Sequence, residues 1–109
     1  MALMAHTFTD SCPDCFVLFE SWMLDGIEDL VKLGQPRPIY LVREIREQGA
    51  VEATRKLVGK PNPSEGFIRL LLAGLKDRTL EASVLDHGLP CPLFDAALIR
   101  VAMDRLGRS

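Results

Sequence analysis

The sequence predicts an all-α fold, a single compact bundle of five to six short helices. Three observations support this class. Apolar residues recur at intervals of three and four along most of the chain, and no segment alternates apolar and polar residues as a half-buried strand does. Glycines and prolines divide the chain into short segments. The length of 109 residues suits one domain with its own hydrophobic core.

The N-terminal third predicts a loosely held end followed by a helix. Residues 1–10 show no helical pattern, so the predicted domain covers residues 11–109. Ser11 is a candidate N-cap, and Pro13 suits the first turn of a helix. Gly34 is the expected end of this helix. Between them the apolar residues follow helical spacing, at Phe16, Phe19, Met23, Ile27 and Leu30.

Two further helices are predicted over residues 39–48 and 50–58, each followed by a glycine. We expect the buried side of the first to be formed by its apolar residues, Ile39, Val42 and Ile45. Its charged residues, Glu44 among them, predict a solvated face held together by ion pairs.

A fourth helix is predicted to begin at Pro63 and to end near Leu72. Asn62 is the expected N-cap, and Glu65 three residues later completes a pattern that resembles a capping box. Proline is favoured at the first helical position because its missing N–H has no partner there in any case.

The C-terminal third predicts two more helices separated by a loop. Thr79 is the expected N-cap of a short helix that ends at Leu85. Residues 87–92 contain one glycine and two prolines, which predict a loop. The last helix is expected from Leu93 to Leu106, with Asp95 as an acidic residue in its first turn.

The charges are unevenly spread along the chain, although the net charge is only −2. Residues 1–34 carry six acids and one base, whereas residues 35–80 carry nine bases and five acids. The basic middle segment predicts a surface for a protein partner or for nucleic acid. Five of its nine basic residues are the candidate nucleic-acid contacts, Arg55, Lys56, Lys60, Arg69 and Lys76.

The cysteines and one histidine form two pairs with metal-binding spacing. Cys12 and Cys15 make a Cys-x2-Cys pair, and His87 and Cys91 make a His-x3-Cys pair. One hypothesis is a structural zinc ion held by all four, with His6 as a substitute for His87. A second is a redox dithiol at the first pair, since a helix N-terminus stabilises a thiolate. A third is that the cysteines are small buried residues without chemistry.

The segment Cys12-Pro13-Asp14-Cys15 resembles the active-site motif of thioredoxin-like proteins. The resemblance covers four residues and does not extend to the strands that support that motif. The chain contains three cysteines, an odd number that predicts a reducing, cytoplasmic location and no disulfide framework. No stretch has the composition of a signal peptide or a membrane span.

The segment from Ala53 to Gly74 loosely resembles a helix-turn-helix, whose second helix would read a DNA major groove. Its turn is longer than the tight form, and its second helix offers a single base, Arg69. An ordinary helical hairpin is the alternative.

Residues 48–105 resemble a small helical module found in uncharacterised bacterial proteins. The resemblance implies a shared helical fold and no known activity. It depends on short segments, namely Gly49-Ala50-Val51, Pro63-Ser64-Glu65-Gly66-Phe67, Arg69-Leu70, Asp77-Arg78-Thr79-Leu80-Glu81-Ala82 and Pro92-Leu93-Phe94.

The sequence contains no phosphate-binding loop, no Gly-x-Ser-x-Gly and no His-Glu-x-x-His motif. We therefore expect a non-enzymatic helical interaction module that binds a protein partner or nucleic acid through residues 37–78. The zinc protein and the thiol redox protein are the alternatives. The aromatic residues Phe16, Phe19 and Trp22 also suggest a homodimer, because one small core has limited room to cover them.

Overall fold

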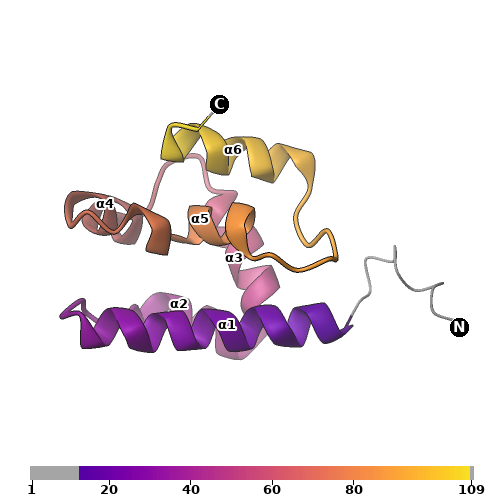
Figure 1. The fold of residues 1–109 in the computed structure, drawn as a ribbon, viewed down its shortest axis with the longest axis horizontal. Coiled ribbons are helices and arrows are strands. Elements are labelled where there is room, and N and C mark those ends of the chain that lie inside the picture. The colour runs from indigo at the N-terminus through magenta and orange to yellow at the C-terminus, as the bar shows by residue number, and fades with distance from the viewer. Residues whose placement is uncertain (1–12, 109) are drawn as a thin grey trace, which may run out of the picture.

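The computed structural model describes residues 13–108, and the predicted all-α class is confirmed over them (Figure 1). No strand occurs within this range. The longest helix has 20 residues, more than the short helices expected. The elements in chain order are α1 (Pro13–Lys32), α2 (Ile39–Gln48), α3 (Ala50–Val58), α4 (Glu65–Leu72), the 3-10 turn η2 (Lys76–Arg78), α5 (Leu80–Asp86) and α6 (Ala96–Leu106).

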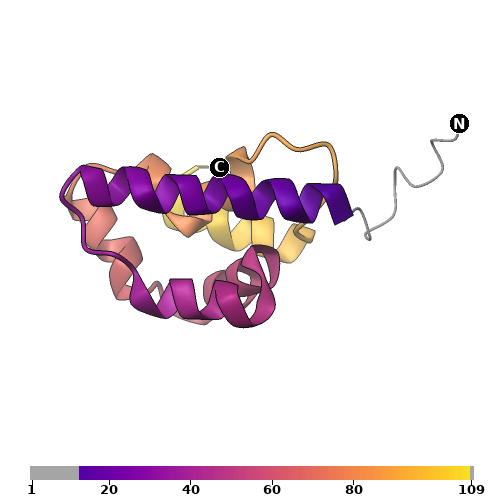
Figure 2. The same cartoon turned by 90° about the horizontal axis from the view of Figure 1, so that it is seen from below.

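The helices form two layers that α3 connects. Figure 1 shows α1 and α2 in the lower layer and α4, α5 and α6 in the upper layer, with α3 running between the two. Figure 2 shows α1 extending along the length of the molecule. The most extensive packing is between α5 and α6, between α2 and α3, and between α1 and α3. None of the described helices is long and apolar enough to cross a membrane.

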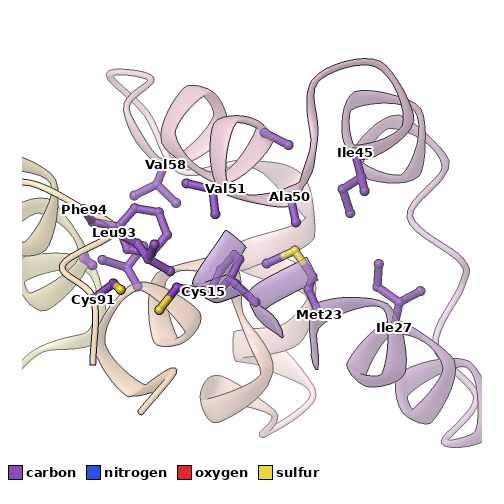
Figure 3. Close-up of a cluster of buried hydrophobic side chains, with 14 residues drawn as sticks. Cys15, Met23, Ile27, Ile45, Ala50, Val51, Val58, Cys91, Leu93 and Phe94 are labelled. Carbon is purple, nitrogen blue, oxygen red and sulfur yellow. The ribbon is translucent and has the colours of Figure 1, made fainter. Parts of the chain in front are cut away.

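The core lies where α1, α3 and the loop before α6 meet (Figure 3). The rings of Phe19 and Phe94 pack edge to face, with 5.5 Å between their centroids. Phe19 is completely buried. Each segment contributes several buried side chains, Cys15, Met23 and Ile27 from α1, Ala50, Val51 and Val58 from α3, and Cys91 and Leu93 from the loop.

Several predicted helix limits agree with the structure. The bounds of α2 and α3 are those expected, and Gly49 separates the two helices with a φ of 87°. A positive φ of this size favours glycine, because a side chain would crowd the backbone. Thr79 caps α5 as expected, with its hydroxyl accepting a hydrogen bond from the N–H of Ala82 at 3.1 Å.

The predicted starts of α4 and α6 were wrong. Ser64, not Asn62, caps α4, and its hydroxyl accepts from the N–H of Phe67 at 3.1 Å. Pro63 therefore precedes the helix, in the extended segment that leads to the cap. Asp95 is the N-cap of α6 and accepts from the N–H of Leu98 at 2.8 Å. The preceding residues Leu93 and Phe94 are not helical because they enter the core as part of the loop.

The predicted buried side of α2 also needs correction. Ile39 was expected in the core, but 66% of its surface is exposed. Glu44 was expected in solvent, but it is only 5% exposed. Ile45 is buried as expected. The buried side of α2 therefore lies around Glu44 and Ile45, because α3 supplies a lysine that neutralises the carboxylate there.

Candidate functional site

An open cleft lies between the C-terminal half of α1 and the helix α4, and we call it the α1–α4 cleft. Its volume is about 830 Å³, within the range of about 300 to 1,000 Å³ that is usual for ligand pockets. The first turn of α2, the end of α3 and the start of α5 complete its walls. Its large side chains are mainly apolar, among them Trp22, Ile27, Leu30, Tyr40, Phe67 and Leu70.

Three large apolar side chains of the cleft are open to solvent. Trp22 on α1 is 45% exposed, and Ile39 and Tyr40 at the start of α2 are 66% and 44% exposed. Prolines in the preceding turn, Pro36 and Pro38, are also part of the wall. Folded proteins commonly bury side chains of this size, so their grouping around a cleft makes this surface the candidate site.

Gly26 forms part of the cleft wall in the middle of α1. A Cβ atom built at this position would meet no heavy atom of the surrounding structure within 4 Å. Glycine in a helix interior lowers stability by about 1 kcal/mol relative to alanine. The missing side chain leaves the backbone of α1 open to close approach by a bound group.

The charges around the cleft are of both signs. The Lys60 ammonium lies over the Tyr40 ring, 5.2 Å from its centroid. Arg78 in η2 approaches Asp29 on α1 at 3.9 Å, and both residues line the cleft. Asp25 and Arg69 add one charge of each sign. The cleft therefore has no single-sign field that would select a polyanion.

Arg37 is held in the turn between α1 and α2 by a two-point ion pair with Glu28. Its Nη1 and Nη2 atoms donate to the two carboxylate oxygens, the second at 3.1 Å. This hydrogen-bonded guanidinium holds the pKa of Glu28 below its usual value. Arg37 also lines the cleft, so the pair orders one edge of the cleft wall.

The five predicted nucleic-acid contacts have different surroundings in the structure, and their role stays a prediction. Arg55 donates from Nε and Nη2 to the carbonyl of Leu93 at 3.1 and 2.6 Å. Lys56 pairs with buried Glu44. Lys60 and Arg69 line the cleft, whereas Lys76 lies in η2 and is not part of it.

The metal-binding prediction is partly outside the structure, because Cys12 and His6 precede the described residues. Cys15 and Cys91 are 3% and 6% exposed and belong to the same core cluster (Figure 3). His87 and Cys91 line a separate cavity of about 200 Å³. Within residues 13–108 no group of three or more metal-ligating side chains is placed to hold one ion. The zinc site and the dithiol stay predictions.

His87 is half-buried and packs against two aromatic rings that also contact each other. Its ring lies edge-on to Phe19 and tilted to Phe94, with 5.9 Å between centroids in both pairs. Its Nδ1 accepts a hydrogen bond from the N–H of Leu89 at 3.0 Å, which favours the neutral ring with the proton on Nε2. Burial lowers the pKa of His87, and the neighbouring Asp86 opposes this effect.

Glu44 is a buried acid that the sequence analysis placed in solvent. Lys56 donates to its two carboxylate oxygens at 3.1 and 3.2 Å, and Gln48 also donates to it. These hydrogen bonds, that of Lys56 first, hold the pKa of Glu44 below its usual value. The sequence feature that could have predicted this ion pair is Gly49, because a turn at Gly49 folds α3 back against α2 and brings Lys56 to Glu44.

Arg105 on α6 connects three elements through a second buried ion pair. Its Nη1 donates to Glu81 on α5 and to the carbonyl of Val58, both at 3.0 Å. Its Nη2 donates to the carbonyl of Lys60 at 2.5 Å. The side chains of Arg105 and Glu81 are only 10% and 4% exposed. No local pattern identifies this cluster, because its partners are far apart in the sequence.

Comparison with protein-family models, with curated proteins and with solved structures gives no match for this chain. The geometry of the site is therefore the basis for a functional proposal.

Proposed function

We propose that this protein is a non-enzymatic interaction module whose α1–α4 cleft binds an apolar helical segment of a partner protein. The observation that carries the proposal is the open cleft of about 830 Å³ with Trp22, Ile39 and Tyr40 exposed on its walls. An amphipathic helix docks in such a groove through apolar residues spaced three and four apart. The open backbone at Gly26 gives that helix room to approach α1 closely.

The same observations favour a protein partner over nucleic acid. Arg55 and Lys56 already donate to a carbonyl and a carboxylate of the fold, which leaves them fewer donors for phosphate. A helix that reads a DNA groove presents polar donors to the bases. The outward side of α4 instead presents apolar Ile68, Leu71 and Leu72, which does not support the helix-turn-helix version.

A selection of helical peptides from a display library tests the proposal. Trp22 is the only tryptophan of the chain and lines the cleft, so its fluorescence reports occupancy directly. We expect the selected peptides to be amphipathic and to shift the Trp22 emission towards the blue as they bind.

Gly26→Leu is the decisive variant, because it places a side chain in the empty space of the cleft. We expect it to weaken peptide binding at least about tenfold, the equivalent of losing one or two buried methylene contacts. Ser21→Leu adds the same side chain to an exposed position of α1 outside the cleft and is the matched control.

Two results would contradict the proposal. One is that selected peptides bind the Gly26→Leu variant as tightly as the unmodified protein. The other is salt-dependent binding of DNA or RNA that Lys60→Ala and Arg69→Ala abolish, since this would make nucleic acid the ligand.

The presence of Cys15 and Cys91 in one core cluster favours a second proposal, a structural zinc ion held with Cys12 and His87. Such an ion would join the start of α1 to the loop after α5 and would add its binding free energy to folding. The test is the metal content of the purified protein together with its melting temperature before and after chelation. About one zinc per chain and a lower melting temperature after chelation are expected. A metal-free preparation with a reactive Cys12 would favour the dithiol instead.

A further inference from the structure

Most of the charged side chains that line the α1–α4 cleft have partners within the chain. The pairs are Arg37–Glu28, Arg78–Asp29, Asp77–Arg108 and Glu81–Arg105. Glu65 and Arg69 lie one turn apart on α4, so their opposite charges offset each other on one face of the helix. The lining charges that remain are Asp25 and Lys60, and neither forms an ion pair within residues 13–108.

Lys60 lies at one side of the cleft in a defined position. Its carbonyl oxygen accepts a hydrogen bond from Nη2 of Arg105 at 2.5 Å, which holds the backbone just after α3. Its ammonium lies over the exposed ring of Tyr40, 5.2 Å from the centroid, and the guanidinium of Arg43 lies 5.7 Å from the same centroid. This side of the cleft is therefore basic, and we call Tyr40, Arg43 and Lys60 the basic side of the cleft.

Asp25 lies on the other side of the cleft, on α1. It is exposed and precedes Gly26, where the missing side chain leaves the helix backbone open. Trp22 lies one turn earlier on the same helix and also lines the cleft. Figure 2 shows α1 and α2 along opposite long edges of the molecule, so Asp25 and the basic side border the cleft on different walls.

A helix that docks in the cleft covers both of these charges. Docking removes water from the Asp25 carboxylate and from the Lys60 ammonium, and a charge that loses water without gaining a partner of opposite sign raises the free energy of the complex. The apolar stripe of the docked helix enters the cleft, while its two flanks lie against the two walls, as the e and g positions do in a coiled coil. A partner can therefore supply the missing charges from its flanks.

Building on the proposed function, we propose that the partner helix carries an acidic residue on the flank that meets Lys60 and a basic residue on the flank that meets Asp25. Such a pattern also fixes the direction in which the helix lies. Turning the helix end for end, with its apolar stripe still in the cleft, exchanges the two flanks and places like charges together at both walls. The walls therefore select one direction of the partner helix as well as its charges.

The peptides selected from the display library test this pattern first. They should carry Asp or Glu on one flank of the apolar stripe and Lys or Arg on the other. Selected peptides that lack this arrangement, or that carry charges of one sign on both flanks, overturn the proposal.

Charge reversal in the protein tests which wall meets which charge. Lys60→Glu and Asp25→Lys should each weaken binding of a labelled selected peptide about fivefold or more, measured by fluorescence anisotropy at physiological salt, because an attraction becomes a repulsion. Arg46→Glu and Asp104→Lys are the matched controls, since they change the net charge equally at exposed positions outside the cleft. Long-range effects of net charge are screened at this salt concentration, so the controls should bind as the unmodified protein does. Circular dichroism confirms that all four variants keep the helical fold.

A complementary change in the peptide completes the test. Replacing the acidic flank residue of the peptide with lysine should weaken its binding to the unmodified protein and restore binding to Lys60→Glu, because opposite charges meet again. Equal binding of both peptides to both proteins overturns the proposal. So does a reversed peptide that gains affinity for Asp25→Lys in place of Lys60→Glu.

This inference and the proposed function fail in different ways. Peptides that bind the unmodified protein, lose affinity for Gly26→Leu and ignore the charges of Asp25 and Lys60 would keep the cleft as a helix-binding site and overturn the charge pattern alone. If no helical peptide binds, or if Gly26→Leu binds normally, the proposed function fails and this inference fails with it.

Discussion

The guanidinium group of Arg105 connects α6 with α5 and with the end of α3 through hydrogen bonds. Arg105 lies on α6, and its guanidinium neutralises Glu81 on α5. The same group donates hydrogen bonds to the carbonyls of Val58, the last residue of α3, and of Lys60, and so covers the C-terminal end of α3. Helix ends leave carbonyl groups without intrahelical partners, and these need donors when they are covered. The planar guanidinium can donate to the carboxylate and to both carbonyls at once, because its donors point in several fixed directions. The compact ammonium of a lysine lacks this arrangement of donors.

Replacing Arg105 with methionine should therefore cost much more than the loss of an exposed ion pair. The substitution leaves Glu81 buried without its cation, and breaking a buried pair in this way typically costs about 3 to 5 kcal/mol. Urea denaturation measures the change in the free energy of unfolding. Arg108→Met is the control, since its pairs with Asp77 and Asp86 lie at the surface. Similar losses for both variants would argue against a special role for the Arg105 cluster.

His87 should make folding stability depend on pH in a defined window. Its pKa in the folded state lies below the ordinary value of 6.5 because the ring is buried. At a pH below about 6.5 the unfolded chain therefore binds a proton that the folded chain does not bind, and stability falls as pH falls. The loss stops once the pH is below the folded-state pKa.

The measurement is the free energy of unfolding from about pH 8 to pH 5, for the unmodified protein and for His87→Gln. The difference between the two curves should be constant above the window and should change inside it. His6 is present in both chains, so its contribution cancels. Parallel curves through the whole range would contradict the buried-histidine explanation.

At the scale of single elements, the limits of the helices show what local sequence signals can predict. The bounds of α2 and α3 and the Thr79 cap of α5 follow from residues within each segment. The start of α6 does not, because Leu93 and Phe94 are drawn into a core formed with α1. Helical spacing cannot distinguish an apolar residue in a first turn from one in a loop that enters the core.

The start of α4 offers a direct comparison of two candidate caps. Ser64→Ala removes the hydroxyl that accepts from the N–H of Phe67, and we expect a loss of about 1 kcal/mol. Asn62→Ala should have little effect, because Asn62 lies before the helix and is exposed. Thermal or urea denaturation of the two variants measures the difference. A larger loss for Asn62→Ala would restore the cap that the sequence predicted.

At the scale of the whole molecule, the candidate site was much less predictable than the fold. The α1–α4 cleft combines segments from α1 to α5, and which apolar side chains stay open depends on how the layers meet. The helical spacing of α1 indicated a buried stripe, yet Trp22 beside it remains 45% exposed. The basic middle segment indicated a charged surface, but Arg55 and Lys56, although partly exposed, hydrogen-bond to Leu93 and Glu44 of the fold. Such pairings depend on tertiary structure.

The two layers should unfold together, because the loop before α6 carries Phe94 against Phe19 on α1. Phe94→Ala should lower the free energy of unfolding by about 3 to 5 kcal/mol. Circular dichroism follows all helices, whereas Trp22 fluorescence follows α1, and the two transitions should coincide. Ile68→Ala, at a position 47% exposed, is the control and should have a small effect. Separate transitions would show that the layers are independent units.

The contact between Phe19 and Phe94 also has a consequence for synthesis of the chain. Ribosomes produce α1 first, whereas Phe94 and the other core residues of the loop before α6 are made only after α5. The exit tunnel still holds that loop when α1 and α2 have emerged, so Phe19 then lacks its contact with the ring of Phe94. Chaperones that hold apolar nascent segments would therefore find Phe19 partly uncovered until the loop before α6 has emerged.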